Sequence, residues 1–305
     1  MHILFIKTAE RSILKKTRKP FPGIAALLFL TLAFSLKVAA SSTTNDSLWK
    51  VFRSKDLPDS ARLKALHAIA WGYCYTNSDS SGILVEEELK LARSSGQKKW
   101  EANAVNLKGV LYMNRGDYPT ALDLFHKALE LFREAGIKKG VGNCYNNIGL
   151  IYTYQSDYTN ALKHYLMALK LREELKDKSG IAYCYNNIGI IYRNQKDYSK
   201  ALSYYEKALQ LNRELGDKIG TAIAQHNVGL IYQAKNDNAT ALKNFREALL
   251  IQEEVGDKKG MAGSYIDVAN TYNVRSELST ALDYYEKALE LKKEIGDKEG
   301  IALCY

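Results

Sequence analysis

Proline and cysteine are scarce in this sequence, and familiar catalytic motifs are missing from it. The 305 residues include four prolines and four cysteines, while 46% are hydrophobic and 25% charged, a composition typical of a folded, helix-rich protein. No phosphate-binding loop, GxSxG elbow or HExxH motif is present. The five histidines are scattered, and no CxxC pair or Cys and His cluster suggests a metal site. We therefore expect no enzyme active site, metal or cofactor within these residues.

The cysteines are expected to be small apolar residues of helices. Cys144, Cys184 and Cys304 occupy the same place in copies of a repeated unit. Equivalent places in neighbouring units should lie further apart than the roughly 7 Å between α-carbons that a disulfide tolerates. Disulfides between these copies are therefore not expected.

The net charge of +9 is concentrated near the N-terminus. Residues 1–40 contain seven Lys or Arg and one acidic residue, so they carry +6 of it, and the rest of the chain is close to neutral. A nearly neutral body has no broad basic surface for phosphates. We therefore expect a protein or peptide partner and no nucleic acid.

The N-terminal stretch has the order of a secretory signal. Basic residues between positions 15 and 19 precede an apolar run at 23–36, and small residues at 38–40 lead into a polar stretch. The run of 14 residues is short for crossing a bilayer, which takes roughly 20. We predict a signal peptide at residues 1–40, cleaved after Ala40, and an exported, periplasmic or extracytoplasmic protein. An uncleaved signal anchor or a buried apolar helix are the alternatives.

A unit of 40 residues recurs along most of the chain. Three columns of small residues mark it: Gly140, Gly180, Gly220, Gly260 and Gly300; Ala121, Ala161, Ala201, Ala241 and Ala281; and Ala128, Ala168, Ala208, Ala248 and Ala288. No insertion breaks the register. A strict period of this length predicts a solenoid, in which stacked units bury each other's apolar faces.

Each unit is predicted to be a helical hairpin. In the copy at 178–217, apolar residues from Ala182 to Tyr192 recur every three or four positions, and those from residue 201 to residue 211 do the same. Asp197 lies in the polar turn between the two runs, where it could cap the second helix. Gly216 and Asp217 could end that helix and cap the next.

The repeats are assigned to residues 58–97, 98–136, 137–176, 177–216, 217–256 and 257–296, with a partial seventh at 297–305, after a polar linker at 41–57. The opening repeat is degenerate, with a turn expected at 78–82 and a second helix at 83–92. The sixth departs from the others at Ala269, Glu277 and Leu278. Because the sequence ends within a predicted first helix, we expect it to be a fragment of a longer protein.

The unit resembles the tetratricopeptide (TPR) signature. The residues that match its spacing are Tyr185, Ile188, Gly189, Tyr192, Ala201, Tyr205 and Ala208. The usual length of 34 residues is here 40, similar to the repeats of kinesin light chain and of the Leu-Gly-Asn repeat adaptors, and the proline that often ends the second helix is absent. The resemblance implies an all-α fold, a right-handed α-solenoid of about six hairpins and the start of a seventh. It also implies a concave groove, lined by first helices, that binds peptide segments.

Projected onto that arrangement, the groove is predicted to be lined by Asn146, Asn147, Leu150, Asn186, Asn187, Ile190, Arg193, His226, Asn227, Leu230 and Gln233. Asparagine is unfavourable inside helices, so its repetition suggests a compensating use. Side-chain amides both donate and accept, and a ladder of them could hold an extended peptide by its backbone. Alternatively, the amides hydrogen-bond between neighbouring helices and stabilise the stack.

Two functions remain open. Exported proteins that resemble this one often continue into a membrane helix and a histidine kinase or a transcriptional output domain, which suggests the sensory region of a bacterial signalling protein. The alternative is a self-contained exported scaffold or adaptor. A membrane contact is expected only through a signal anchor or a missing C-terminal segment.

Overall fold

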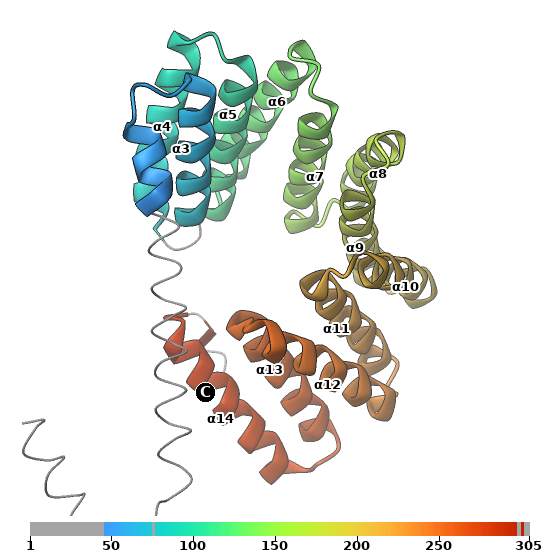
Figure 1. The fold of residues 1–305 in the computed structure, drawn as a ribbon. Helices are drawn as coiled ribbons and strands as arrows, with labels where there is room; N and C mark the ends of the chain where they lie inside the picture. The colour runs from blue at the N-terminus through green and yellow to red at the C-terminus, as the bar shows by residue number, and fades with distance from the viewer. Residues whose placement is uncertain (1–45, 75–76, 298–299, 302–305) are drawn as a thin grey trace, which may run out of the picture.

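The computed structural model describes residues 46–74, 77–297 and 300–301, and these residues form helices without any strand (Figure 1). The predicted signal peptide lies outside the described residues, as do residues 302–305. No helix in the described part is long and apolar enough to cross a membrane. The prediction of an all-α solenoid is confirmed for this part of the chain.

Each repeat is a pair of helices, and the odd-numbered label marks its first helix. The pairs are α3 (Asp59–Tyr73) and α4 (Ser78–Ser94), α5 (Lys98–Asn114) and α6 (Tyr118–Glu134), α7 (Lys138–Tyr154) and α8 (Tyr158–Glu174), α9 (Lys178–Asn194) and α10 (Tyr198–Leu215), α11 (Lys218–Ala234) and α12 (Asn238–Val255), and α13 (Lys258–Val274) and α14 (Leu278–Glu294). From α5 onward, equivalent helices begin 40 residues apart.

The helix ends follow the predicted turn chemistry. The Asp197 carboxylate accepts a hydrogen bond of 3.1 Å from the backbone amide three residues further on, at the start of α10. Gly216 ends α10 in the left-handed conformation, with φ of +67°, which glycine adopts without steric strain. Asp217 then caps α11 in the same way. Glu277 makes no side-chain cap, so α14 begins without this contact.

A glycine in the middle of four first helices, α5, α7, α9 and α11, allows an aromatic ring of the second helix to approach closely. A Cβ atom on Gly189 would lie 2.5 Å from Cε1 of Tyr205, which is buried completely. The same pairing recurs as Gly109 with Phe125, Gly149 with Tyr165, and Gly229 with Phe245. This glycine column therefore has a packing reason in every repeat where it occurs.

The repeats stack into an arc whose inner side is formed by first helices (Figure 1). Each first helix contacts the first helix of the next repeat, from α3 with α5 to α11 with α13. Within the described residues, no two second helices come that close. Because the first helices are crowded and the second helices are spread apart, the array curves with its first helices inside.

The opening repeat differs from its prediction at two places. Ser78 is the first residue of α4 and Asn77 caps that helix, so the turn expected at 78–82 is wrong. The Asn77 side chain satisfies the amide of Ser80 and starts the helix earlier than the apolar pattern indicates. Residues 46–53, within the predicted linker, are helical, and Phe52 packs into the core.

Candidate functional site

All of the residues predicted to line the groove lie on the first helices α7, α9 and α11, but they are not equally accessible. Asn146, Asn186, Asn187 and Asn227 are buried, with at most 9% of each exposed. The other predicted residues, Asn147, Leu150, Ile190, Arg193, His226, Leu230 and Gln233, are half-buried. The structure therefore places four of the five predicted asparagines in the floor of the inner face and not on its surface.

Several of these polar side chains join neighbouring first helices. The Asn147 amide donates to Asn106 Oδ1 on α5 at 3.0 Å. His226 Nε2 lies 2.8 Å from an Asp267 carboxylate oxygen on α13. Gln233 donates to the Thr271 hydroxyl of the same helix at 2.8 Å. These contacts are hydrogen bonds between neighbouring helices, as the alternative interpretation of the amides predicts. That the same side chains bind a peptide stays a prediction.

Asn146 and Asn186 occupy equivalent positions with different surroundings. The Asn146 amide and the Cys184 sulfur lie 3.7 Å apart, within hydrogen-bonding distance for sulfur. At the place equivalent to Cys184, the next repeat has Ala224, which offers no such group. Asn186 Oδ1 is buried without a hydrogen-bond partner in the described structure. The side-chain oxygen of Asn186 is therefore left without a hydrogen bond from the described array.

A polar pocket of about 510 Å³ lies on the inner face of the first four repeats. Its lining residues come from four first helices and from the end of α8: His67, Trp71, Asn103, Asn106, Lys139, Asn143, Asn146, Asn147, Arg172, Asp177, Ser179, Gly180 and Tyr183. Five asparagines and two exposed aromatic side chains thus surround one depression. Two of the asparagines, Asn146 and Asn147, belong to the predicted groove.

A buried arginine gives this pocket its charge. The Arg172 guanidinium, in a residue only 4% exposed, donates to the Asp177 carboxylate and to the Asn143 side-chain oxygen, while its Nε has no partner in the described structure. Lys139 Nζ lies 3.8 Å from the same carboxylate. Burial raises the pKa of Asp177, but the Gly180 amide and Arg172 outweigh it, so this pKa is lowered. Arg172 and Lys139 thus carry one positive charge more than the carboxylate between them neutralises. This excess favours an anionic ligand.

The most accessible row of the inner face was missed by the sequence analysis. Asn143 is exposed, and Tyr183 and Ile223 keep 54% and 46% of their surface exposed. They lie four residues before Asn147, Asn187 and Asn227, one helical turn earlier on the same face. The spacing of four residues could therefore have identified this row from the sequence.

Arg172 also differs from the residues at the same place in the other repeats, which are Phe132, Asn212, Gln252 and Lys292.

The cysteines behave as apolar helix residues where the structure describes them. Cys74, Cys144 and Cys184 are free and buried. Burial raises the pKa of Cys144 to about 12 and that of Cys184 to about 11, so both are neutral thiols at ordinary pH. Cys304 lies outside the described residues. No group of His, Cys, Asp and Glu side chains in the described ranges is arranged to hold a metal ion.

Comparison with known proteins agrees with the fold. Solved structures with the same architecture include BtubC from P. vanneervenii (20% identity, 77% of this chain and 92% of that one, TM-score 0.58) and the apo form of RapI (20%, 77% and 84%, 0.62). A STAND signal-transduction ATPase of Pyrococcus horikoshii, which has a tetratricopeptide repeat sensor, is 18% identical over 82% of this chain and 40% of its own length (TM-score 0.59). A search of curated proteins gives no significant match.

The family model of the tetratricopeptide repeat matches four overlapping windows, at residues 100–174, 140–214, 180–254 and 220–294. Together these windows cover the second to sixth repeats, well over half of the chain. Arrays of this kind are protein–protein interaction modules. The chain belongs to the tetratricopeptide repeat family.

Proposed function

We propose that the inner face of this array binds an extended segment of a partner protein, with an acidic side chain of that segment in the polar pocket. The observation that carries the proposal is the buried Arg172, held among asparagine amides on the inner face with its Nε unpaired. Asparagine amides on successive helices could hydrogen-bond to a peptide backbone. Lys139 and Arg172 would attract a carboxylate, and Tyr183 would contact an apolar side chain.

The hydrogen bonds between first helices fit this proposal because joining the helices and binding a partner are roles of different residues. Half-buried amides such as Asn147 fix the spacing of neighbouring first helices, whereas the exposed row with Asn143, Tyr183 and Ile223 faces the space inside the arc. A groove whose floor is already hydrogen-bonded loses little entropy when a peptide binds. The proposed groove is therefore preorganised.

Site-specific photo-crosslinking tests the groove. A photoreactive residue at position 183 would lie on the inner face, and one at position 206 would lie on an exposed part of the second helix α10. In cells that make the protein, we expect position 183 to capture a partner and position 206 to capture none. Capture at position 206 alone would contradict the proposal.

We further propose that this module is the exported sensory region of a larger bacterial signalling protein. The basic and apolar order of residues 1–40 supports export, and the tetratricopeptide repeat sensor of the P. horikoshii ATPase supports a sensory use of such an array. The mass of the mature protein should place its N-terminus at Ser41, and a retained leader would contradict cleavage. Reading the gene past Tyr305 should reveal a membrane segment and an output domain, whereas an early stop would favour the self-contained scaffold.

A further inference from the structure

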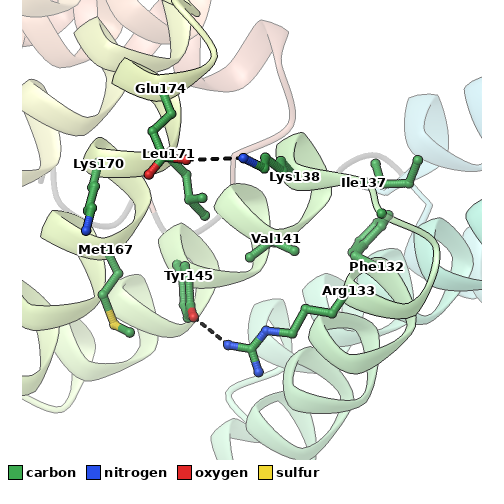
Figure 2. A pocket seen from close by; sticks show the side chains of 11 residues that line it. Phe132, Arg133, Ile137, Lys138, Val141, Tyr145, Met167, Lys170, Leu171 and Glu174 are labelled. Carbon is green, nitrogen blue, oxygen red and sulfur yellow. Dashed lines mark hydrogen bonds and ion pairs between the residues drawn. The ribbon is translucent and has the colours of Figure 1, made fainter.

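A second, mainly apolar crevice lies on the other face of α7. It occupies about 580 Å³ between the end of α6, the start of α7 and α8, and it shares no lining residue with the polar pocket. Figure 2 shows the side chains around it: Phe132, Arg133, Ile137, Lys138, Val141, Tyr145, Met167, Lys170, Leu171 and Glu174. Phe132, Val141 and Tyr145 are buried, whereas Met167 keeps 38% of its surface exposed.

The next repeat has the same crevice in a smaller form. Its lining residues, such as Ile181, Tyr185 and Leu211, stand 40 positions after their counterparts, but the space measures only about 220 Å³. Lys207 occupies the place of Met167, and its ammonium lies 5.8 Å and 5.2 Å from the ring centres of Tyr185 and Tyr204. The other repeats also carry a charged residue there: Lys127, Glu247 and Lys287. Among the aligned repeats, only the third has an apolar residue at this place.

An exposed methionine at a place where charged residues are the rule points to contact with an apolar group. Leu166, the residue before it, is 44% exposed, and its counterparts His126, Glu206, Arg246 and Glu286 are polar. Two adjacent apolar residues on α8 thus replace a solvated face. Of these two residues, Met167 lines the enlarged crevice and Leu166 is next to it in the sequence.

The polar rim of this crevice carries an excess of positive charge. The Arg133 guanidinium donates to the Tyr145 hydroxyl at 2.7 Å, and Lys138 pairs with Glu174 at 3.4 Å (Figure 2). Lys170 is exposed on the same rim, with no acidic partner among the lining residues. Three cations and one carboxylate therefore frame an apolar floor. A carboxylate beside an apolar group is the chemistry that complements it.

We propose that this crevice is a second docking site, which takes a bulky apolar side chain flanked by acidic residues from a segment of a partner protein. The apolar side chain lies against Val141, Tyr145 and Met167, and the acidic residues face Lys170 and Arg133. Because α7 lies between this crevice and the polar pocket, the two sites can be occupied at the same time. The array then offers one partner an inner contact and another partner a separate one.

A short peptide probe tests this site on the full chain. The probe is the blocked pentapeptide Gly-Asp-Phe-Asp-Gly with a fluorinated phenylalanine ring, and its matched controls replace both Asp by Lys or the Phe by Ala. The chain has four methionines, so ¹³C-methyl labelling gives a simple NMR spectrum. We expect the Met167 methyl signal to move saturably with the acidic probe, while those of Met113 and Met261 do not move.

Two substitutions copy the residues of the next repeat, with the ¹⁹F signal of the probe as readout. Met167→Lys should weaken binding at least about tenfold, because it fills the crevice and buries no apolar contact. Lys170→Gln should weaken it about two- to fivefold, the effect of one exposed ion pair. Lys207→Gln, at the place equivalent to Met167, is the matched control and should change nothing. Both tested positions are exposed on helix α8, so folding should persist.

Several results would overturn the proposal. They are an unmoved Met167 signal at millimolar probe, equal binding of the lysine probe, and undiminished binding to the Met167→Lys protein. Movement of the Met167 signal with protein concentration alone would mean that a second copy of the chain occupies the crevice.

Discussion

The fourth and sixth repeats follow the same plan but satisfy it to different degrees. In the fourth, Gly189 lets Tyr205 approach until that ring is fully buried, and Asp197 caps the second helix. In the sixth, Ala269 stands in the place of the glycine, and Tyr285 remains partly exposed. Glu277, the residue before its helix α14, makes no side-chain cap. The sixth repeat therefore lacks the glycine and the second-helix cap of the fourth, while Asp257 still caps its first helix.

This difference shows which features hold a repeat together. In a stacked array, stability is approximately the sum of what each repeat supplies and what its neighbours add. We therefore expect the fourth repeat to be locally more stable than the sixth, with the contrast carried by the glycine, the ring and the cap.

The largest effect is expected from closing the glycine gap. Gly189→Ala places a Cβ atom 2.5 Å from the Tyr205 ring, and overpacking of this kind costs about 1–3 kcal/mol. The helix propensity of alanine returns only about 1 kcal/mol. Amide hydrogen exchange in α9 and α10 should report the loss. The matched variant Ala269→Gly should lose only the propensity term, and a more stable Gly189→Ala protein would contradict the close-approach account.

A smaller effect separates the two tyrosines. The Tyr205 hydroxyl is buried without a partner in the described structure, whereas the Tyr285 hydroxyl donates to Asn270 Oδ1 at 2.5 Å. Removing an unsatisfied buried hydroxyl should stabilise the protein, so Tyr205→Phe should gain about 1 kcal/mol in urea unfolding. Tyr285→Phe should lose about 0.5–1 kcal/mol. Equal losses in both variants would mean that the Tyr205 hydroxyl is satisfied.

The third effect, similar in size but limited to the first turn of one helix, concerns the helix caps. Asp197→Ala removes a capping carboxylate and should cost about 1 kcal/mol, measured as faster exchange of the first amides of α10. Glu277→Asp should supply the missing cap of α14 and slow exchange there. Protection that does not change in either variant would show that side-chain caps do not distinguish the two repeats.

Most of the fold could be predicted because it repeats. Periodic spacing of apolar residues identified the helix pairs, and residues with local roles, such as Asp197 and Gly216, could be interpreted from their neighbours in sequence. The start of α4 could not, because the Asn77 cap replaced the turn that the apolar pattern indicated at 78–82. The first repeat departs from the common pattern, so its residues could not be aligned with equivalent positions in the other repeats.

The site was harder to predict because it depends on contacts between repeats. The first helices were correctly identified, but all of the predicted asparagines except Asn147 are buried, and the row with Tyr183 and Ile223 is more accessible. The exposure of a helical side chain depends on how far the neighbouring helix is turned, which spacing alone does not determine. The buried Arg172 contacts Asn143 from another helix, a pairing across 29 positions that no local pattern reveals.

The most direct test of the inner-face proposal compares two double variants, each of which replaces two exposed side chains by alanine. Tyr183→Ala with Ile223→Ala removes exposed side chains from the inner row, and Glu206→Ala with Lys243→Ala removes exposed ones from second helices. Thermal melts should show that both remain folded, and co-purification from cells measures partner binding. The account predicts that only the inner pair loses the partner. Binding that survives the inner pair but is lost with the outer pair would contradict it.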